Sequence, residues 1–146
     1  MPAKFIQPNF ATQDAGTYKA AIDASAAAMK SIGNASAPHQ SSPPAMNITL
    51  EPGMLIVTTG GIVWPAEQVT GNMAAPTGGN YRYDLVVRDK TTGAVSIVTG
   101  TPGLSNPAIP ALPADKFPMG IVLLYTGMTQ ILDADIIDAR CFLDAR

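Results

Sequence analysis

Two side chains that could serve in nucleophilic catalysis each occur once in the sequence, His39 and Cys141. A cysteine nucleophile needs a base within hydrogen-bond reach, and histidine commonly fills that role. His39, however, lies in a Pro/Ser-rich stretch, and Cys141 lies between Arg140 and Phe142. These settings are typical of a histidine that forms surface hydrogen bonds and of a packed, inert thiol. We therefore expect no catalytic residue and a protein that is not an enzyme.

The acidic cluster Asp133, Asp135 and Asp138 has a spacing at which carboxylates can hold calcium. The glycine and the distal glutamate of an EF-hand loop are absent from it, which favours a structural role. We expect these carboxylates to cap backbone groups and to pair with Arg140 or Arg82. No phosphate-binding or metalloprotease motif occurs in the chain. The sequence therefore predicts no metal site and no cofactor.

The composition argues against nucleic acid and membranes as partners and favours copies of the same chain. Charged residues make up 14% of the chain, against about 25% in typical domains. Missing charge marks the cores of interfaces, so we expect a homo-oligomer, with a Thr/Ser/Asn-rich monomer surface as the alternative. The net charge of −2 and the scattered Lys and Arg residues argue against nucleic acid. No apolar run approaches the roughly 18 residues of a membrane span, and the single cysteine indicates a reducing, cytosolic origin.

The elements that must position these side chains are mostly β-strands, and residues 81–100 give the clearest pattern. Apolar and polar residues alternate from Tyr81 to Arg88, as in a half-buried strand. Residues 89–93 predict a turn closed by Gly93, and residues 95–99 predict the return strand. Within the first strand, Arg82 and Asp84 share one face, and we expect them to meet a cross-strand charge.

Short strands with Gly and Pro between them continue on both sides of this hairpin. They are expected at residues 46–50, 54–59, 62–64, 67–70, 120–125 and 129–132. The run at 120–125 is almost wholly apolar, which predicts burial on both of its faces. In the proline-rich connection 101–117, we expect Leu104, Ile109 and Leu112 to pin the chain to the body. The sequence thus predicts a mainly β fold, an antiparallel β-sandwich or small barrel, preceded by an N-terminal arm and one α-helix.

The N-terminal third has a different character. Residues 1–33 are expected to form an extended arm and an alanine-rich helix for oligomerisation or anchoring, residues 34–45 a Pro/Ser linker, and residues 46–146 the β domain. Thr12 or Asp14 can cap the helix, and Gly33 can end it. Its apolar positions recur every three or four residues, which suits contact between identical helices, or packing on the β domain. The predicted interface residues are Phe5, Ile6, Phe10, Tyr18, Ile22, Met29 and Trp64.

Several motifs between residues 35 and 140 resemble those of small virion structural proteins of tailed bacteriophages. They occur at residues 38–46, 52–53, 83–87, 89–95, 98–102, 110–114 and 135–140. β domains of this group also occur in tail fibres and baseplates. The resemblance implies a non-enzymatic and usually trimeric part of the phage particle, with no catalytic residues to transfer.

The absence of a repetitive shaft after the β domain favours a protein that decorates or cements the capsid. Its partners would be copies of itself and the major capsid protein, and its location would be the virion, after synthesis in the host cytoplasm. The alternative is a tail-fibre or baseplate adaptor that binds tail proteins. A remoter alternative is a carbohydrate-binding module, in which Trp64, Tyr81, Tyr83 and Tyr125 would form a stacking platform.

Overall fold

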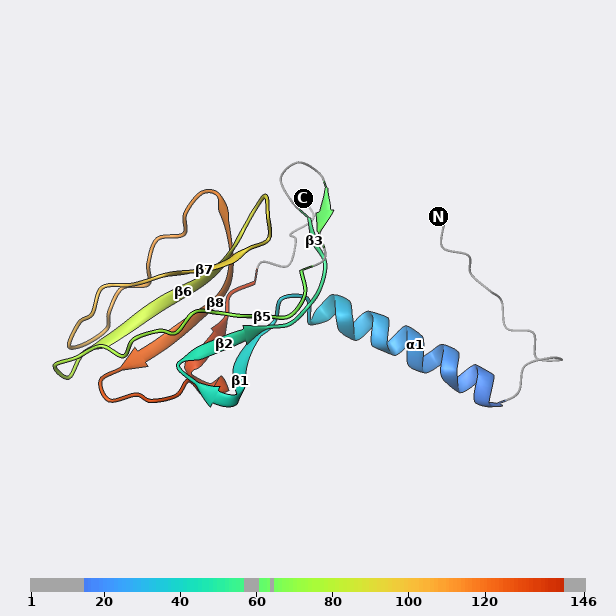
Figure 1. Cartoon of the computed structure of the whole chain (residues 1–146), viewed down its shortest axis with the longest axis horizontal. Coiled ribbons are helices and arrows are strands. Elements are labelled where there is room, and N and C mark those ends of the chain that lie inside the picture. Colours follow the sequence, from blue (N-terminus) through green and yellow to red (C-terminus); the bar gives the residue numbers. More distant parts are fainter. Residues whose placement is uncertain (1–14, 57–60, 64, 141–146) are drawn as a thin grey trace. The chain divides into compact units, whose positions relative to one another are not determined.

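The computed structural model describes residues 15–56, 61–63 and 65–140 (Figure 1). The chain divides into two compact units, residues 1–33 and residues 34–146. This division falls where the sequence predicts the end of the helix. The N-terminal arm and Cys141 lie outside the described residues, so the expectations for them stay predictions.

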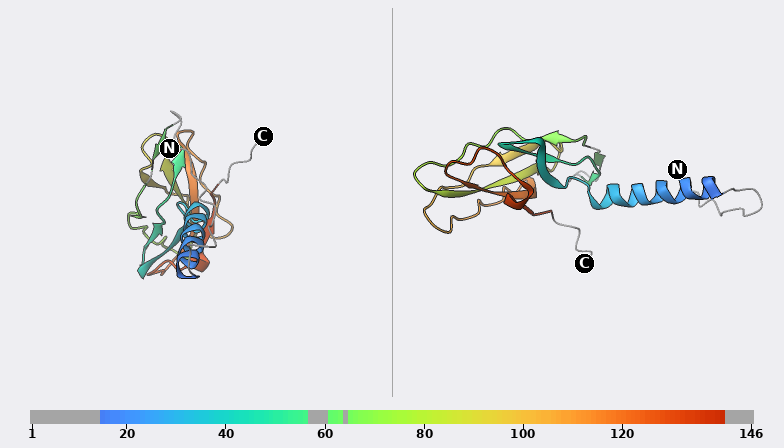
Figure 2. Two further views of the ribbon diagram at one scale, coloured as in Figure 1. Left: turned by 90° about the vertical axis from the view of Figure 1, so that its right-hand side faces the viewer. Right: turned by 90° about the horizontal axis from the view of Figure 1, so that it is seen from below.

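The first unit contains one helix, α1 (Ala15–Gly33), which runs unbroken in both views of Figure 2. Its alanine content explains its formation, since alanine has the highest helix propensity. On its surface Lys19 and Asp23, one turn apart, form an ion pair of 2.5 Å. The helix ends at Gly33 as predicted, whereas both predicted capping residues lie outside the described part. None of the described helices is long and apolar enough to cross a bilayer.

The second unit is a β-sandwich made of antiparallel strands. A three-stranded sheet has the order β1-β2-β5, and a four-stranded sheet has the order β7-β6-β8-β9. The bounds of these strands are β1 (Pro38–Ala45), β2 (Asn47–Leu50), β5 (Gln68–Val69), β6 (Tyr81–Asp89), β7 (Val95–Val98), β8 (Lys116–Tyr125) and β9 (Ile136–Asp138). A small ribbon pairs β3 (Leu55–Ile56) with β4 (Ile62–Val63), and a 3-10 turn, η1 (Asp133–Asp135), precedes β9. The expected mainly β fold, built of antiparallel sheets and preceded by one helix, is therefore confirmed.

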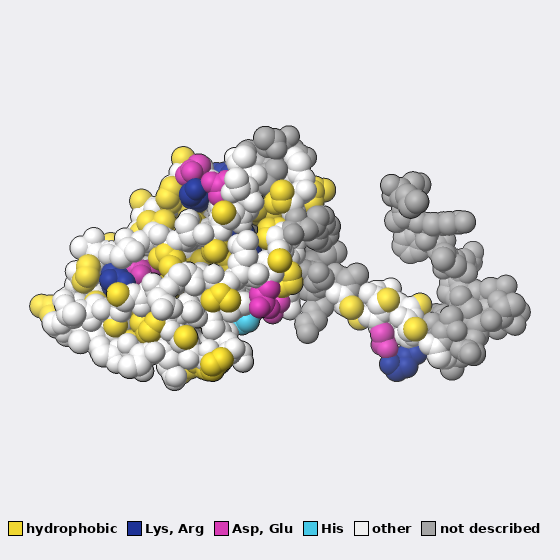
Figure 3. Space-filling model, in the orientation of Figure 1, with side chains coloured by type: hydrophobic (Ala, Val, Ile, Leu, Met, Phe, Trp, Pro, Cys, Tyr) yellow, Lys and Arg dark blue, Asp and Glu magenta, His cyan; other side chains and the backbone are white. Residues whose placement is uncertain are grey.

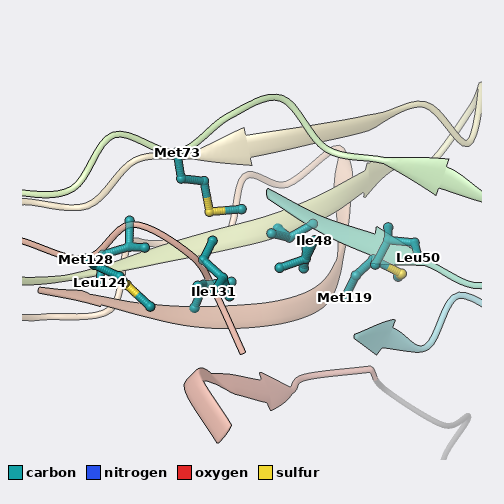
Figure 4. Packing of buried hydrophobic residues seen from close by; sticks show 9 residues of the cluster. Ile48, Leu50, Met73, Met119, Leu124, Met128 and Ile131 are labelled. Carbon is teal, nitrogen blue, oxygen red and sulfur yellow. The ribbon is translucent and has the colours of Figure 1, made fainter. Parts of the chain in front are cut away.

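The hydrophobic core lies between the two sheets (Figure 4). Ile48 and Leu50 of β2 are fully buried against apolar side chains of the four-stranded sheet. Full burial of one such side chain contributes about 1.5–3 kcal/mol. The remaining core residues are Met73, Val86, Met119, Val122, Leu124, Met128 and Ile131. Several of them come from loops, so the core fixes the connections as well as the strands.

The central hairpin forms as the sequence predicts. β6 pairs with β7 from Leu85↔Val98 to Arg88↔Val95. Gly93 in the turn has φ of +72°, a conformation that glycine adopts without steric cost. β6 also pairs with β8 over its whole length, with a register shift between Val86 and Val87.

The prediction of a linker in this segment is wrong in part, because residues 38–45 form strand β1. β1 lies at the edge of its sheet, where a proline without an N–H group costs no ladder hydrogen bond. Its pairing with β2 is irregular between Gln40 and Ala45, the stretch that contains Pro43 and Pro44. The prolines therefore made an edge strand look like a linker.

Three further expectations are corrected by the structure. The last strand is β9, and not residues 129–132, where Ile131 is buried as a core residue. Leu104, Ile109 and Leu112 do not pin the long connection, because all three are exposed. β8 is not buried on both faces, since its burial alternates along the strand. Burial alternates because successive side chains of β8 point in turn to the core and to the outer surface of the sheet.

Candidate interaction surface

The face of the four-stranded sheet that points away from the core is apolar. In an antiparallel ladder, directly paired residues share a face, and alternate residues along a strand do so too. One row across the sheet contains Val98, Leu85, Ile121 and Ile137. The next rows pair Tyr83 with Leu123 and Tyr81 with Tyr125. These three rows contain no charged side chain.

This face is only partly covered by the rest of the chain. Leu85 is buried, but Tyr81 is 44% exposed, Tyr125 42% and Ile137 52%. Between them lie half-buried side chains. We call the incompletely covered residues that β6, β8 and β9 contribute to these rows the outer face; they are Tyr81, Tyr83, Ile121, Leu123, Tyr125 and Ile137. An apolar patch of this kind is typical of an interaction site.

The opposite face of the same sheet carries a buried ion pair. Arg82 and Asp84 contact each other through two hydrogen bonds, from Nε at 2.7 Å and from Nη2 at 2.9 Å. Nη2 of Arg82 also donates to the carbonyl of Ala74, and the carboxylate of Asp84 accepts from the N–H of Gly100. The expectation of a cross-strand charge is therefore wrong, because the two residues pair along one strand. Their network ties two loops to β6.

A second arginine on the core side, Arg88, is fully buried, and among the described residues it pairs with no carboxylate. Its Nη1 donates to Gln68 Oε1 and to the carbonyl of Gly93, both at 2.8 Å. Its Nε and Nη2 have no acceptor among the described residues. Burial lowers the pKa of this guanidinium, because the charged form loses hydration.

His39 forms local contacts in the described structure. Its Nδ1 lies 2.8 Å from the carbonyl oxygen of Gln40, so this nitrogen carries a proton and donates it. Its Nε2 lies 3.4 Å from a carboxylate oxygen of Glu51, close enough for an ion pair when the ring is protonated, although the two are not aligned as a hydrogen bond. The structure thus bears out a hydrogen-bonding histidine. Whether it meets Cys141 lies outside the described residues.

The three aspartates of the acidic cluster each have a structural partner. Asp133 accepts a hydrogen bond of 2.6 Å from the N–H of Gln40, and Asp135 accepts one from the N–H of Leu132. Asp138 forms a bidentate pair with Arg140, which lowers the pKa of the carboxyl. The predicted capping and the pairing with Arg140 are therefore confirmed. Among the described residues, no three His, Cys, Asp or Glu side chains are placed to hold a metal ion.

The residues predicted to form an interface are described only in part. Ile22 is 55% exposed and Met29 is 74% exposed on α1. The backbone of Tyr18 lies in α1, but its side chain is outside the description, as are Phe5, Ile6, Phe10 and Trp64. The expected contacts of all seven residues remain a prediction.

The outer face was not identified from the sequence, although its signal is present there. The alternation that includes Tyr81 and Tyr83 predicts a half-buried strand, and the apolar run 120–125 predicts a strand buried on both faces. Taken together, the apolar run in β8 and the aromatic residues at alternate positions of β6 predict a sheet with two apolar faces. Such a sheet needs a covering layer on each face. Among the described residues of the β unit the second layer is incomplete.

Charged side chains occupy a few separate spots on the visible side of the β unit, with apolar and uncharged side chains between them (Figure 3). At one end of the sheet, Lys116 contacts Asp89 at 2.7 Å and Asp115 at 3.0 Å. No protein-family model, curated protein or solved structure matches this chain. Function must therefore be inferred from the surfaces themselves.

Proposed function

We propose that the chain is a non-enzymatic structural protein of a tailed-bacteriophage virion, a homo-oligomeric, trimeric protein that decorates or cements the capsid. The observation that carries its mode of action is the outer face, three rows of apolar side chains without a charge and incompletely covered. The resemblance of residues 35–140 to virion proteins supports the class. A protein of this kind stabilises a particle by burying surface against its neighbours.

The helix supplies a second surface for assembly. Residues 18, 22, 25, 29 and 32 are separated by four, three, four and three residues, the spacing of a coiled-coil seam. An isolated helix of 19 residues is only marginally stable in water. Contact between the α1 helices of identical chains would stabilise it, and the exposed Ile22 and Met29 fit that role.

The proposed partners are copies of this chain and the major capsid protein, in the virion, after synthesis in the host cytoplasm. The tail alternative, an adaptor of a tail fibre or baseplate, differs in copy number and position and not in chemistry. Both alternatives act through protein contacts and involve neither nucleic acid nor a membrane. The few, scattered Lys and Arg residues argue against nucleic-acid binding.

Particles of the phage that encodes the chain provide the test. Purified virions are separated into heads and tails, and the chain is quantified in each fraction by mass spectrometry. We expect it in the heads, at a copy number comparable with that of the major capsid protein. A few copies in the tails would favour the adaptor, and absence from both fractions would contradict a virion role.

A carbohydrate-binding role has one observation in its favour. The structure places Tyr81, Tyr83 and Tyr125 on one face, and aromatic rings can stack on sugars. The neighbouring positions are Ile and Leu, which offer no hydrogen-bond donors to sugar hydroxyls. A glycan array with the native chain and a Tyr125→Ala variant tests this role, which requires specific binding that the variant loses.

A further inference from the structure

We infer that residues 107–113 form a polyproline II segment that another protein binds in a groove lined by aromatic rings and hydrogen-bond donors. We call these residues the proline ridge; they lie in the connection between β7 and β8. The inference deepens the proposed function and rests on it for the source of the partner, a neighbouring protein of the particle.

Prolines recur at every third position of the proline ridge, as Pro107, Pro110 and Pro113. The proline ring fixes φ at about −65° and also holds the preceding residue in an extended conformation. Three residues complete one turn of a polyproline II helix, so the prolines share one edge of it. Ile109 and Leu112 share a second edge, one turn or about 9 Å apart.

Burial in the structure follows the same three-residue period. Pro107, Pro110 and Pro113 are half-buried, whereas every residue between them is exposed. Ile109 is 51% exposed and Leu112 is 46% exposed. The prolines therefore face the body of the protein, and the two aliphatic side chains lie on the solvent side.

The β unit holds the proline edge in place. The ring of Pro110 packs on Gly100, where an added Cβ would lie 3.3 Å from the Cγ of this ring. Gly100 is itself held by its N–H, which donates to the buried carboxylate of Asp84. At the end of the ridge, the N–H of Lys116 donates to the carbonyl of Pro113 at 3.1 Å. Because the ridge is held before it binds, less entropy is lost on binding.

The backbone of the proline ridge selects the kind of partner. Among the described residues, none forms a hydrogen bond with the backbone of residues 108–112. A purely apolar surface that covered Ile109 and Leu112 would remove water from these carbonyl groups and leave them without donors, which costs free energy. The partner must therefore supply donors as well as apolar contact. Grooves that bind polyproline II segments do so, because Trp and Tyr side chains offer both.

The groove belongs to a protein other than this chain. Residues 101–114 carry no charge, so the contact does not depend on ion pairs. The exposed aromatic side chains among the described residues are Tyr81 and Tyr125, which are cross-strand neighbours on the outer face. A sheet face contacts a ridge from one side only and does not enclose it. A second copy bound to the ridge is therefore an outcome that contradicts the inference.

The experiment uses the full chain and phage particles that are made without it. Binding is measured by co-sedimentation of the labelled chain with these particles over a range of chain concentrations. The ridge variant is Ile109→Ser with Leu112→Ser. The matched control is Ile62→Ser with Leu104→Ser, which removes the same types of exposed side chain outside the ridge. Circular dichroism and the melting temperature show whether each variant is folded.

We expect the ridge variant to bind the particles at least about tenfold more weakly than the native chain, because two buried aliphatic contacts are lost. The control should bind as the native chain does. Equal binding by the ridge variant and the native chain, or an equal loss in the control, would overturn the inference and leave the proposed function standing. Failure of the native chain itself to bind would contradict both.

A third variant tests the conformation of the ridge. Ala111→Pro removes one backbone N–H and keeps both aliphatic side chains. A groove for a polyproline II segment uses carbonyl groups and side chains, so this variant should bind at least as tightly as the native chain. A partner that added the segment to a sheet as a strand would need that N–H. A tenfold loss of binding in Ala111→Pro would therefore overturn the inference.

The chemistry of the groove is tested with a photoreactive phenylalanine analogue at position 112. Ultraviolet light is applied to the chain bound on particles, and the adduct is mapped by mass spectrometry. We expect an adduct with one particle protein, on a segment that contains Trp, Tyr or Phe. An adduct with a second copy of this chain, or with a segment that has no aromatic residue, would contradict the inference.

Discussion

The two faces of the four-stranded sheet reverse the usual distribution of polarity. The core face buries two arginines and an aspartate beside its apolar side chains, whereas the outer face leaves two tyrosines and an isoleucine in contact with water. The buried charges of Arg82 and Asp84 are tolerable because each has hydrogen-bonding partners. The exposed apolar side chains of the outer face have no such compensation among the described residues of the β unit.

This difference separates stability from assembly. Substitutions on the core face should change the free energy of unfolding and leave association unchanged, provided that the chain folds. Substitutions on the outer face should do the opposite.

Removal of the buried carboxylate should cost the most. Asp84→Ala leaves the Arg82 guanidinium buried without its counter-ion and the N–H of Gly100 without its acceptor. Loss of one partner from a buried pair typically costs about 3–5 kcal/mol. Urea unfolding measures the change, with Asp23→Ala as the control, because the exposed pair of Asp23 with Lys19 contributes less than about 1 kcal/mol. A loss for Asp84→Ala as small as that of the control would contradict the assigned role of the pair.

Two neighbouring leucines of β8 provide the most direct comparison of the faces. Leu124 is fully buried in the core, and Leu123 lies half-buried on the outer face. Leu124→Ala should lower the free energy of unfolding by about 2–5 kcal/mol, and Leu123→Ala by about 1 kcal/mol, since less apolar area is lost. Only Leu123→Ala should weaken self-association. Equal losses of stability in the two variants would mean that both faces are covered within one chain.

The comparison also explains which parts of the fold could be predicted. Turn chemistry and alternation are local, so the hairpin, the ribbon of β3 and β4 and the short β5 were found close to their positions. Edge strands and loop contacts depend on the tertiary fold. Pro43 and Pro44 therefore predict a linker where the structure has strand β1. Leu104 is predicted to pack on the body, but it is exposed.

The faces of β6 were harder to assign than the strand itself. Alternation separates Tyr81 and Tyr83 from Arg82 and Asp84, but it does not say which set points inwards. Hydrophobicity alone would place the tyrosines inside, whereas the structure places the ion pair there. The decisive fact is that Arg82 and Asp84 satisfy each other along the strand and also bind Ala74 and Gly100, which no short-range pattern predicts.

Arg88 should respond in the opposite direction from Arg82. Its Nε and Nη2 find no acceptor in the described chain, so its charge is buried without full compensation. Arg88→Met, which keeps a long side chain, should raise the free energy of unfolding by about 1 kcal/mol, because an apolar replacement of a poorly paired buried ion is often stabilising. Arg82→Met should lower it, because Asp84 then loses its partner. Urea unfolding of both variants is the measurement, and a clear loss of stability in Arg88→Met would show that this guanidinium is better satisfied than its contacts indicate.

The smallest effect is the change of the free energy of unfolding at acidic pH, and it again distinguishes stability from self-association. At the end of the sheet, Lys116 and the N–H groups of Thr92 and Thr91 hold the pKa of Asp89 well below its ordinary value of 3.8. Arg140 likewise lowers the pKa of Asp138. A carboxyl whose pKa is lower in the folded state contributes stability above its unfolded pKa and loses it as the pH falls below that value.

The free energy of unfolding should therefore be flat from pH 8 to about pH 5 and decline below about pH 4. The decline should be shallower in an Asp89→Asn variant, as urea unfolding at each pH will measure. The outer face contains no carboxylate, histidine or lysine, so self-association of the folded chain should stay constant over the same range. An association constant that falls with pH while the protein remains folded would place titrating groups in the contact and would assign it to a surface other than the outer face.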